Sequence, residues 1–555
     1  MEHGALASPD VARTPDGVAD LQHVLQEHRR WLESDRRDGS RADLSLLDLR
    51  GRSLAGANLR AALLRDTRLQ DAELEGADLR DAEGLLPDQL AGSNLKAARL
   101  PESLSYTDAL ANIAHMSHIA SVLFVILLLG CAYVGLTTAA TTDVELITNS
   151  ATSELPIIQT RIRIVSFYWT APLVLLGFYT YFHVFAQRLW EELADLPALF
   201  PDGRPLDKKA YPWFLNDLVR AHFLHLRRHT PGLFLLQRAV AGLLAWWLVP
   251  LTILAIWLRY LPRHDWGGTS FHVLALGLSI LTAYVFHRLA VSTLRREPRP
   301  AFTWRRVFRT GRSIRTFSTL ILVLIGGSLL SLGAINGSHA PLSWNAPGTW
   351  VPHLLRCIGY SPHADFEGAD VSTPPASVPQ TLADRLALTR GASLAGRDLR
   401  YMSARAAFLA KADLRRADLR GAVLEEAVLQ EANLELVRLT GANLEDAELQ
   451  GATLYGADLV SIGLNRADLR HANLAYANLQ DASLFEADLS GADLTAANLQ
   501  GASLEGADLR AANLGLPVGL TQAQIDSACT DSRTRLPEGF RRSQRECTRT
   551  EDSPR

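Results

Sequence analysis

Residues 442–459 read A-N-L-E-D-A-E-L-Q-G-A-T-L-Y-G-A-D-L, a pattern that repeats every five residues. Leucine occupies the centre of each unit, as at Leu444 and Leu449, and a small residue precedes it by two positions. This register continues from residue 392 to residue 516 through 25 units without an insertion, and every centre is leucine except Ala404. A period of five fits neither an α-helix nor a simple strand, so this stretch predicts a repeat array.

Four such units can close one coil of a solenoid, because each unit supplies one side and one corner. The central leucine and the small residue then both point into a narrow interior, which has room for little more than four leucines and the methyl groups beside them. Coils stacked at the ~4.8 Å spacing of paired strands make roughly six coils and a rod of about 30 Å.

The units resemble those of the pentapeptide-repeat family, as in Ala412-Asp413-Leu414, Ala442-Asn443-Leu444 and Ala507-Asp508-Leu509. The resemblance implies the fold of that family, a right-handed quadrilateral β-helix. It also implies a possible partner, because some soluble members have acidic β-helices that resemble DNA and bind type II topoisomerases. Residues 392–420 hold seven basic and three acidic residues, whereas residues 421–516 hold four basic and fifteen acidic ones. These distal coils would suit a basic partner surface.

A second, shorter block occupies residues 42–102, where leucine centres run from Leu44 to Leu79. After the interruption at residues 84–87, two more units centre on Leu95 and Leu100. About two and a half coils are close to the smallest array that can bury its own core.

Both blocks have candidate covers for their exposed coil ends, which would otherwise invite edge-to-edge association. The segment 1–41 contains an amphipathic stretch at 21–32, and the C-terminal segment 517–555 contains a short helical pattern at 520–528. The linker 337–391 carries two further repeat units at 364–373. Cys529 and Cys547 are a possible disulfide in this C-terminal segment if it lies in an oxidising compartment.

Between the blocks, residues 117–336 hold five runs long and apolar enough to cross a membrane. They predict helices at about 119–139, 164–185, 239–258, 271–291 and 317–335. Pro172 and Pro250 fall inside the second and third runs, where side chains of neighbouring helices can satisfy the freed carbonyl groups. The fold class predicted is therefore mixed, with β-helix blocks flanking an α-helical transmembrane domain of about five helices.

Arginine placement predicts the orientation of these spans. The loops at 187–237 and 293–315 are rich in Arg and Lys, which favours the cytoplasmic side. The prediction is a multi-pass protein of a bacterial inner membrane, with a cytoplasmic N-terminal block and an extracytoplasmic C-terminal block. The fourth run is the weakest, and without it both blocks would lie on one side, where they could stack into one composite rod.

Six histidines are the only candidate site residues. His222, His225 and His229 follow a helical spacing, so a metal site is geometrically conceivable, but no cysteine or acidic cluster supports it and interfacial histidines are the favoured interpretation. His183, His272 and His287 lie at or within predicted spans, where an ionisable group is a functional candidate. An apolar face from Trp213 to Leu226, next to three arginines, predicts an interfacial helix held by anionic lipids.

The chain contains no Walker-type loop and none of the G-x-G-x-x-G, G-x-S-x-G or H-E-x-x-H motifs, so we expect no catalytic residues and no cofactor. The leading expectation is a non-enzymatic membrane scaffold that presents its β-helix to a protein or envelope polymer, with membrane lipids as further partners and no nucleic acid. The first alternative is a transporter or channel component that uses the helical bundle. The second is topoisomerase binding by DNA mimicry, which requires a cytoplasmic C-terminal block. The oligomeric state stays open.

Overall fold

The computed structural model describes residues 11–12, 21–150, 152–154, 161–210, 213, 215, 219–226, 232–297, 318, 321–322, 324–329, 331–332, 363–372, 386 and 388–545. The chain forms two compact units. The first unit comprises Met1–Val134, Leu173–Ile253 and Ala275–Leu322, and the second comprises Gly135–Pro172, Leu254–Leu274 and Val323–Arg555.

Within the described residues, four helical stretches are long and apolar enough to cross a membrane. They are α2 (Thr107–Ala140), α4 (Ile164–Ala194), the run formed by α7 (Phe234–Gly242), the π-helical turn η3 (Leu243–Trp247) and α8 (Leu248–Tyr260), and α9 (Trp266–Leu294). Each of these helical stretches is longer than the span predicted from its apolar run, because more polar residues at its ends continue the backbone hydrogen bonding of the helix. The fifth predicted span, 317–335, lies largely outside the described residues, as does most of the predicted loop 293–315.

Both proline residues inside these helices have their freed carbonyl groups bound by a neighbouring helix. Pro172 cannot donate to the Tyr168 carbonyl four residues earlier, and the His272 Nε2 atom of α9 lies 2.9 Å from that oxygen. Pro250 likewise leaves the Trp246 carbonyl free, and the Tyr179 hydroxyl of α4 donates to it at 2.7 Å. Side chains of neighbouring helices thus replace the two missing helical hydrogen bonds.

In the first unit, the repeat block begins at β2 (Arg41–Ala42), which pairs in parallel with β1 (Val11–Ala12). Isolated parallel bridges then join residues twenty apart, from Asp43 with Leu63 onward, so that four units complete each coil. The interruption carries the 3₁₀ helix η1 (Pro87–Leu90), and the offset grows to 21 residues where Glu73 pairs with Asn94. Helix α1 (Leu21–Glu33) buries Val24 and Trp31 next to this block.

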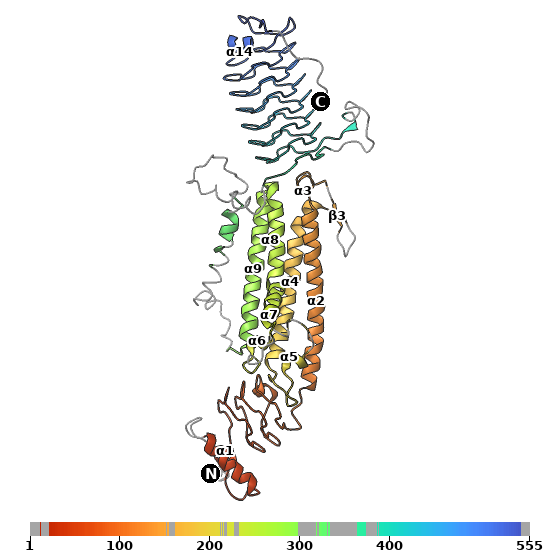
Figure 1. The fold of residues 1–555 in the computed structure, drawn as a ribbon. Coiled ribbons are helices and arrows are strands. Elements are labelled where there is room, and N and C mark those ends of the chain that lie inside the picture. Colours follow the sequence, from red (N-terminus) through yellow and green to blue (C-terminus); the bar gives the residue numbers. More distant parts are fainter. Residues whose placement is uncertain are drawn as a thin grey trace, which may run out of the picture. The chain divides into compact units, whose positions relative to one another are not determined.

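In the second unit, the long block keeps the twenty-residue step from Ser393, which pairs with Asp413, to Asn498, which pairs with Val518 (Figure 1). The central leucines and the small residues form one continuous buried cluster. The second residue of each corner has a positive φ angle, as at Gly441 (67°) and Glu426 (58°). Glycine adopts this conformation without strain, which explains why glycine recurs directly before the small residue.

The two units at 364–373 join this stack, because Asp365 pairs with Ser403 and Asp370 with Phe408. At the far end of the block lies α14 (Gln522–Ser527) (Figure 1). Its N-cap is Thr521, whose hydroxyl accepts from the Gln524 amide. Gln524 in turn donates from Nε2 to the carbonyl groups of the last regular coil.

The other elements in the described part are α3 (Asp143–Thr148), the antiparallel pair β3 (Thr152–Glu154) and β4 (Arg161–Arg163), α5 (Leu206–Lys209), α6 (Val219–His222) and η4 (Leu261–Arg263). Helix α6 has four residues only, and Phe223 and Leu226 that follow it are buried. Part of the interfacial helix predicted from Trp213 to Leu226 lies outside the described residues. Its described residues Phe223 and Leu226 are buried in the first unit and do not form an exposed apolar face.

Candidate interaction surface and the predicted histidine sites

Many acidic residues of the repeats are neutralised within their own unit. An aspartate one position before the central leucine pairs with the arginine one position after it, because both side chains leave the coil on the same side. The pairs are Asp48–Arg50, Asp78–Arg80, Asp398–Arg400, Asp413–Arg415, Asp418–Arg420, Asp468–Arg470 and Asp508–Arg510. In the C-terminal cap, Asp531 and Arg533 form a pair at the same spacing. The Arg50 guanidinium lowers the pKa of Asp48 to about 2. The D-x-R spacing was a readable sequence signal for these pairs.

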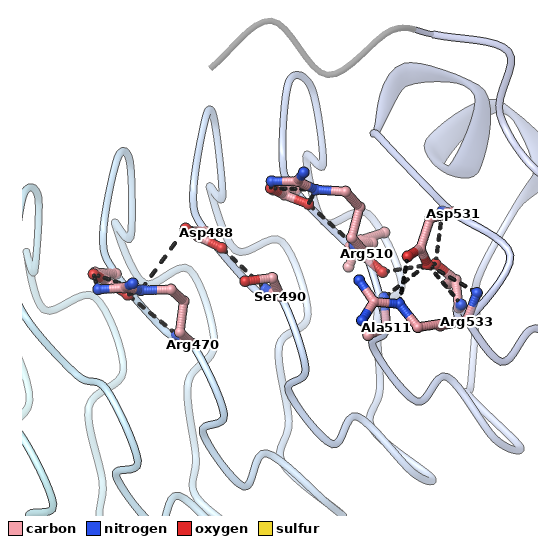
Figure 2. Close-up of polar contacts among 11 residues, drawn as sticks. Arg470, Asp488, Ser490, Arg510, Ala511, Asp531 and Arg533 are labelled. Atoms are coloured by element: carbon pink, nitrogen blue, oxygen red, sulfur yellow. Dashed lines mark hydrogen bonds and ion pairs between the residues drawn. The ribbon is translucent and has the colours of Figure 1, made fainter. Parts of the chain in front are cut away.

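Figure 2 shows how such pairs line one side of the distal coils. Arg470 donates from Nε and Nη2 to the carboxylate of Asp468. Its Nε atom also lies 3.9 Å from the carboxylate of Asp488 in the next coil. Asp488 accepts from the Ser490 amide. These carboxylates therefore serve the coil itself, and they add little to the field that a partner would meet.

The acidic residues that project outward are most numerous on one corner of the second block. Because residues twenty apart lie over one another in successive coils, one corner carries the set that we call the acidic corner: Glu425, Glu426, Glu445, Asp446, Glu486 and Glu505. The arginines of the same corner are Arg405 and Arg466, which leaves a formal charge of −4. Stacking at a strand spacing places these carboxylates in a ladder with a step of about 4.8 Å.

The arginines satisfy only part of this ladder. Arg405 pairs with Glu426 at 2.8 Å and Arg466 with Asp446 at 2.7 Å. Glu486 and Glu505 are exposed and form no ion pair in the described part of the chain. The exposed Phe485 lies on the same corner. The distal half of the acidic corner can thus meet a cationic group directly.

Two corners further round the coil, the surface carries Arg415, Arg416 and Glu435 in its first coils and no charged residue from Tyr455 onward. Leu436, Tyr455 and Tyr476 follow one another in successive coils and are 41–59% exposed. The rings of Tyr455 and Tyr476 lie 5.3 Å apart. Exposed stacked aromatic residues at regular height are typical of binding surfaces. The block therefore offers one acidic and one aromatic ladder.

The last coil of the second block is covered by the chain itself. The Leu509 and Leu514 amides donate to the carbonyls of Cys529 and Arg535, and Ile525 is fully buried. The Asp531 carboxylate accepts from the Ala511 amide at 2.9 Å. Burial raises the pKa of Asp531, but this backbone bond and further bonds outweigh it, so the pKa lies well below its usual range.

The first coil of the second block contacts the segments that follow α2 and α8. The Asp365 amide donates to Asp143 Oδ2 at 2.7 Å, and Arg259 pairs with the other oxygen of Asp143. His264 Nδ1 lies 3.3 Å from Asp398. Burial raises the pKa of Asp398, but the interactions with His264 and Arg400 lower it by more. The pKa of Asp398 therefore lies below its usual range, and the carboxylate stays ionised.

Helix α1 covers the first coil of the first block. Its buried His28 attaches the helix to that coil. The Ala42 amide donates to His28 Nδ1 at 3.1 Å, so Nε2 carries the proton and donates to the Arg60 carbonyl at 3.1 Å. Burial lowers the pKa of His28, and the bond to Arg60 raises it by less. The neutral imidazole therefore fixes the helix to the coil.

The last coil of the first block continues into the loop after α4. The Leu95 amide donates to the Leu199 carbonyl at 2.9 Å, and the Ala198 amide donates to the Ser93 carbonyl at 3.0 Å. Ala198 and Phe200 are buried in the places of the small residue and the central leucine of a repeat. The sequence A-L-F at 198–200 thus imitates a repeat unit, a signal that the sequence analysis missed.

Two basic residues hold the same coil from the outside. Arg296 Nη1 lies 3.0 Å from Asp71 and 3.1 Å from the Ala91 carbonyl, and its guanidinium stacks on Phe223. His225 contacts the Asp71 carbonyl at 2.8 Å and Glu73 at 3.3 Å. The loops after α4 and α9 are therefore bound to the first block.

The structure gives different surroundings to His222 and His225, two of the three histidines that helical spacing grouped as a candidate metal site. His222 is on α6, His225 follows in a turn and is held by the first block, and His229 lies outside the described residues. The described part holds no group of three His, Cys, Asp or Glu residues placed to bind a metal.

The three histidines of the predicted spans have different surroundings. His272 contacts two backbone carbonyls, those of Gly268 and Tyr168. His183 is buried and stacks on Phe286 at 5.2 Å. His287 meets the ring of Trp246 at 4.9 Å and lines a cavity. Cys529 is disulfide-bonded, and its pairing with Cys547 stays a prediction because Cys547 lies outside the described residues.

Comparisons with known proteins agree with the repeat pattern. A family model described as pentapeptide repeats matches in eight copies, at residues 42–81, 390–425, 407–446, 422–460, 464–501 and 487–515. No curated protein matches the chain.

Solved structures of three proteins are similar to parts of it. The pentapeptide repeat protein Rfr23 from the cyanobacterium Cyanothece 51142 is 39% identical, over 17% of this chain and 64% of its own, with a TM-score of 0.15. HetL from the cyanobacterium Nostoc sp. strain PCC 7120, which is involved in heterocyst differentiation regulation, is 30% identical, over 31% and 85%, with a TM-score of 0.16. A pentapeptide repeat protein of the Arabidopsis thaliana thylakoid lumen is 31% identical, over 20% and 71%, with a TM-score of 0.17.

Proposed function

The chain belongs to the pentapeptide-repeat family, and from this premise we propose that it is a non-enzymatic membrane scaffold whose two repeat blocks are right-handed quadrilateral β-helices. The twenty-residue step of the parallel bridges and the buried leucines support this fold. Four long apolar helices suggest a multi-pass membrane protein.

The proposed topology places the first block in the cytoplasm and the second outside it, in a bacterial inner membrane. Arginine-rich loops follow α4 and α9, and these are the loops that contact the first block through Leu199 and Arg296. The arginine-poor loops after α2 and α8 contact the second block through Asp143 and His264. Charge bias and contacts thus support the same assignment.

The acidic corner is the observation that carries the proposed activity. Its six carboxylates form a ladder on a regular coil, and its distal members are exposed and not paired in the described part. A rigid ladder lowers the entropic cost of binding a long partner, and its charge fits a basic protein segment or a cationic envelope polymer. We propose that such a partner binds along this corner.

An affinity capture from solubilised envelopes tests this proposal. The test variant changes Glu425, Glu426, Glu486 and Glu505 to glutamine. A matched control makes the same change of charge on other corners and on the cap, with Glu431→Gln, Asp481→Asn, Asp526→Asn and Glu538→Gln. We expect the partner to be retained by the wild type and the control and lost from the test variant. Equal retention by both variants would refute a role for this corner.

The surroundings of the intramembrane histidines support a scaffold over a transporter. His272 holds the carbonyl freed by Pro172, and His183 is packed between aromatic rings. These are roles in helix packing. Flux assays of a triple variant at His183, His272 and His287 remain the direct test of transport, and unchanged flux would agree with our proposal.

A further inference from the structure

The first unit contains a cavity of about 700 Å³ at the start of the third span. Its walls come from α7, the π-helical turn and α9, with Trp190 of α4 beside them. Most of the lining is apolar, and it includes Leu243, Ile280 and Ala283. Such a lining fits hydrocarbon chains.

The polar residues that line the cavity are positively charged or can become so by taking up a proton. Arg238, His222 and His287 line it, and the lining holds no acidic residue. Arg288, next to His287 in sequence, acts electrostatically on His287 together with Arg238. Neither arginine forms an ion pair within the described ranges. Both arginines are exposed and lie near the ends of the predicted spans, where a lipid phosphate can serve as their counter-ion.

The wall of the cavity departs from regular helix geometry. Residues Leu243–Trp247 form a π-helical turn, and such turns concentrate at functional sites. Trp246 of this turn is 8% exposed, and its indole N–H has no hydrogen-bond partner among the described residues. The indole nitrogen is itself buried, so this residue contributes ring surface to the wall of the cavity.

We propose that this cavity binds one anionic phospholipid. The phosphate group lies at Arg238 and His287, near Arg288, and an acyl chain follows Leu243, Ile280 and Ala283. Basic pockets between transmembrane helices on the cytoplasmic side are typical sites for anionic headgroups. The site differs from the protein-binding acidic corner and does not depend on it.

Thermal unfolding of the full-length protein in detergent tests the proposal, with added phosphatidylglycerol, phosphatidylcholine or inorganic phosphate. A ligand that binds only the folded state raises the midpoint of unfolding. We expect phosphatidylglycerol alone to do so. Each arginine near an anionic headgroup contributes a factor of about five in affinity, so Arg238→Gln with Arg288→Gln should weaken the effect by about 25-fold. The control Arg295→Gln, just beyond α9, should leave it unchanged.

Three outcomes would overturn the proposal. Equal stabilisation by phosphatidylcholine would remove the charge requirement, and equal stabilisation by inorganic phosphate would reduce the site to an anion site without lipid. Loss of the effect in the Arg295→Gln control would indicate general attraction to the membrane surface. A photo-crosslinker in place of Tyr284, which also lines the cavity, identifies the occupant. An adduct with the mass of a phospholipid supports the proposal, whereas a crosslink to another segment of the chain contradicts it.

Discussion

At the scale of single residues, the helical bundle depends on side chains that replace missing backbone donors. The Tyr179 hydroxyl takes the place of the absent Pro250 N–H on the Trp246 carbonyl. Removing that hydroxyl in Tyr179→Phe leaves a buried carbonyl unsatisfied, and we expect a loss of about 1–2 kcal/mol in the free energy of unfolding. Denaturant titration of the detergent-solubilised protein measures this loss.

A second substitution distinguishes this explanation from a general packing defect. Pro250→Ala restores the backbone N–H, so the carbonyl no longer needs Tyr179. The Tyr179→Phe change should then cost much less in the Pro250→Ala background, with a coupling energy of about 1 kcal/mol. Additive effects would show that the hydroxyl has another role.

The buried His28 makes the cover of the first block sensitive to pH. The folded state holds His28 neutral, with a lowered pKa, whereas the unfolded segment takes up a proton near pH 6.5. The unfolded state therefore binds more protons below about pH 6.5, and the docking of α1 weakens as the pH falls through that range. Hydrogen exchange of residues 21–33 should accelerate between pH 7.5 and pH 5.5 after correction for the intrinsic rate. In His28→Phe, exchange should be faster at neutral pH and lose this extra dependence.

At the scale of elements, the loop after α4 acts as a side of the first block. Phe200 occupies the place of a central leucine and is 2% exposed. Truncation in Phe200→Ala should open this edge at a cost of about 3–5 kcal/mol, whereas Phe200→Leu should cost less than about 1.5 kcal/mol because it restores the repeat. Hydrogen exchange of the Leu95 and Ala97 amides, which donate to Leu199 and Pro201, reports the opening. Equal exchange rates of these two amides in Phe200→Ala and Phe200→Leu would contradict the role of Phe200 as the central residue of this unit.

The repeat pattern was the part of the fold most accessible from the sequence. Leucine and alanine positions predict both the coils and their register because each unit carries its own signal, and the first four runs of apolar residues fall within the four long helices. The partners of Arg296 and His225 could not be predicted, since they lie more than 150 residues away. The burial of Phe223 could not be predicted either, because local amphipathicity does not say whether protein or lipid covers a face.

Local motifs also decide which charges are available. Composition alone predicts strongly acidic distal coils, but Asp468 and Asp508 are bound by Arg470 and Arg510 of their own units. What remains is the acidic corner. Position within the five-residue unit thus separates structural carboxylates from those that a partner can reach.

At the scale of the whole molecule, the covered coil ends bear on the composite-rod alternative. The first block is closed by α1 and by residues 196–201, and the second is engaged at residues 364–372 by Asp143 and closed by α14. These segments occupy backbone groups with which another coil would otherwise pair. We therefore expect that the two blocks do not stack on one another.

Topology reporters test that arrangement. An odd number of spans between the blocks puts a reporter fused after Arg555 outside the cytoplasm, and a reporter in the loop after α4 inside it. Deleting the fifth predicted span, residues 317–335, should return the C-terminal reporter to the cytoplasm, because one crossing is lost. A deletion of equal length inside the linker 337–363 keeps the number of crossings and should leave the reporter outside. A cytoplasmic reporter on the intact chain would overturn the topology and reopen the question of a cytoplasmic, DNA-like partner surface.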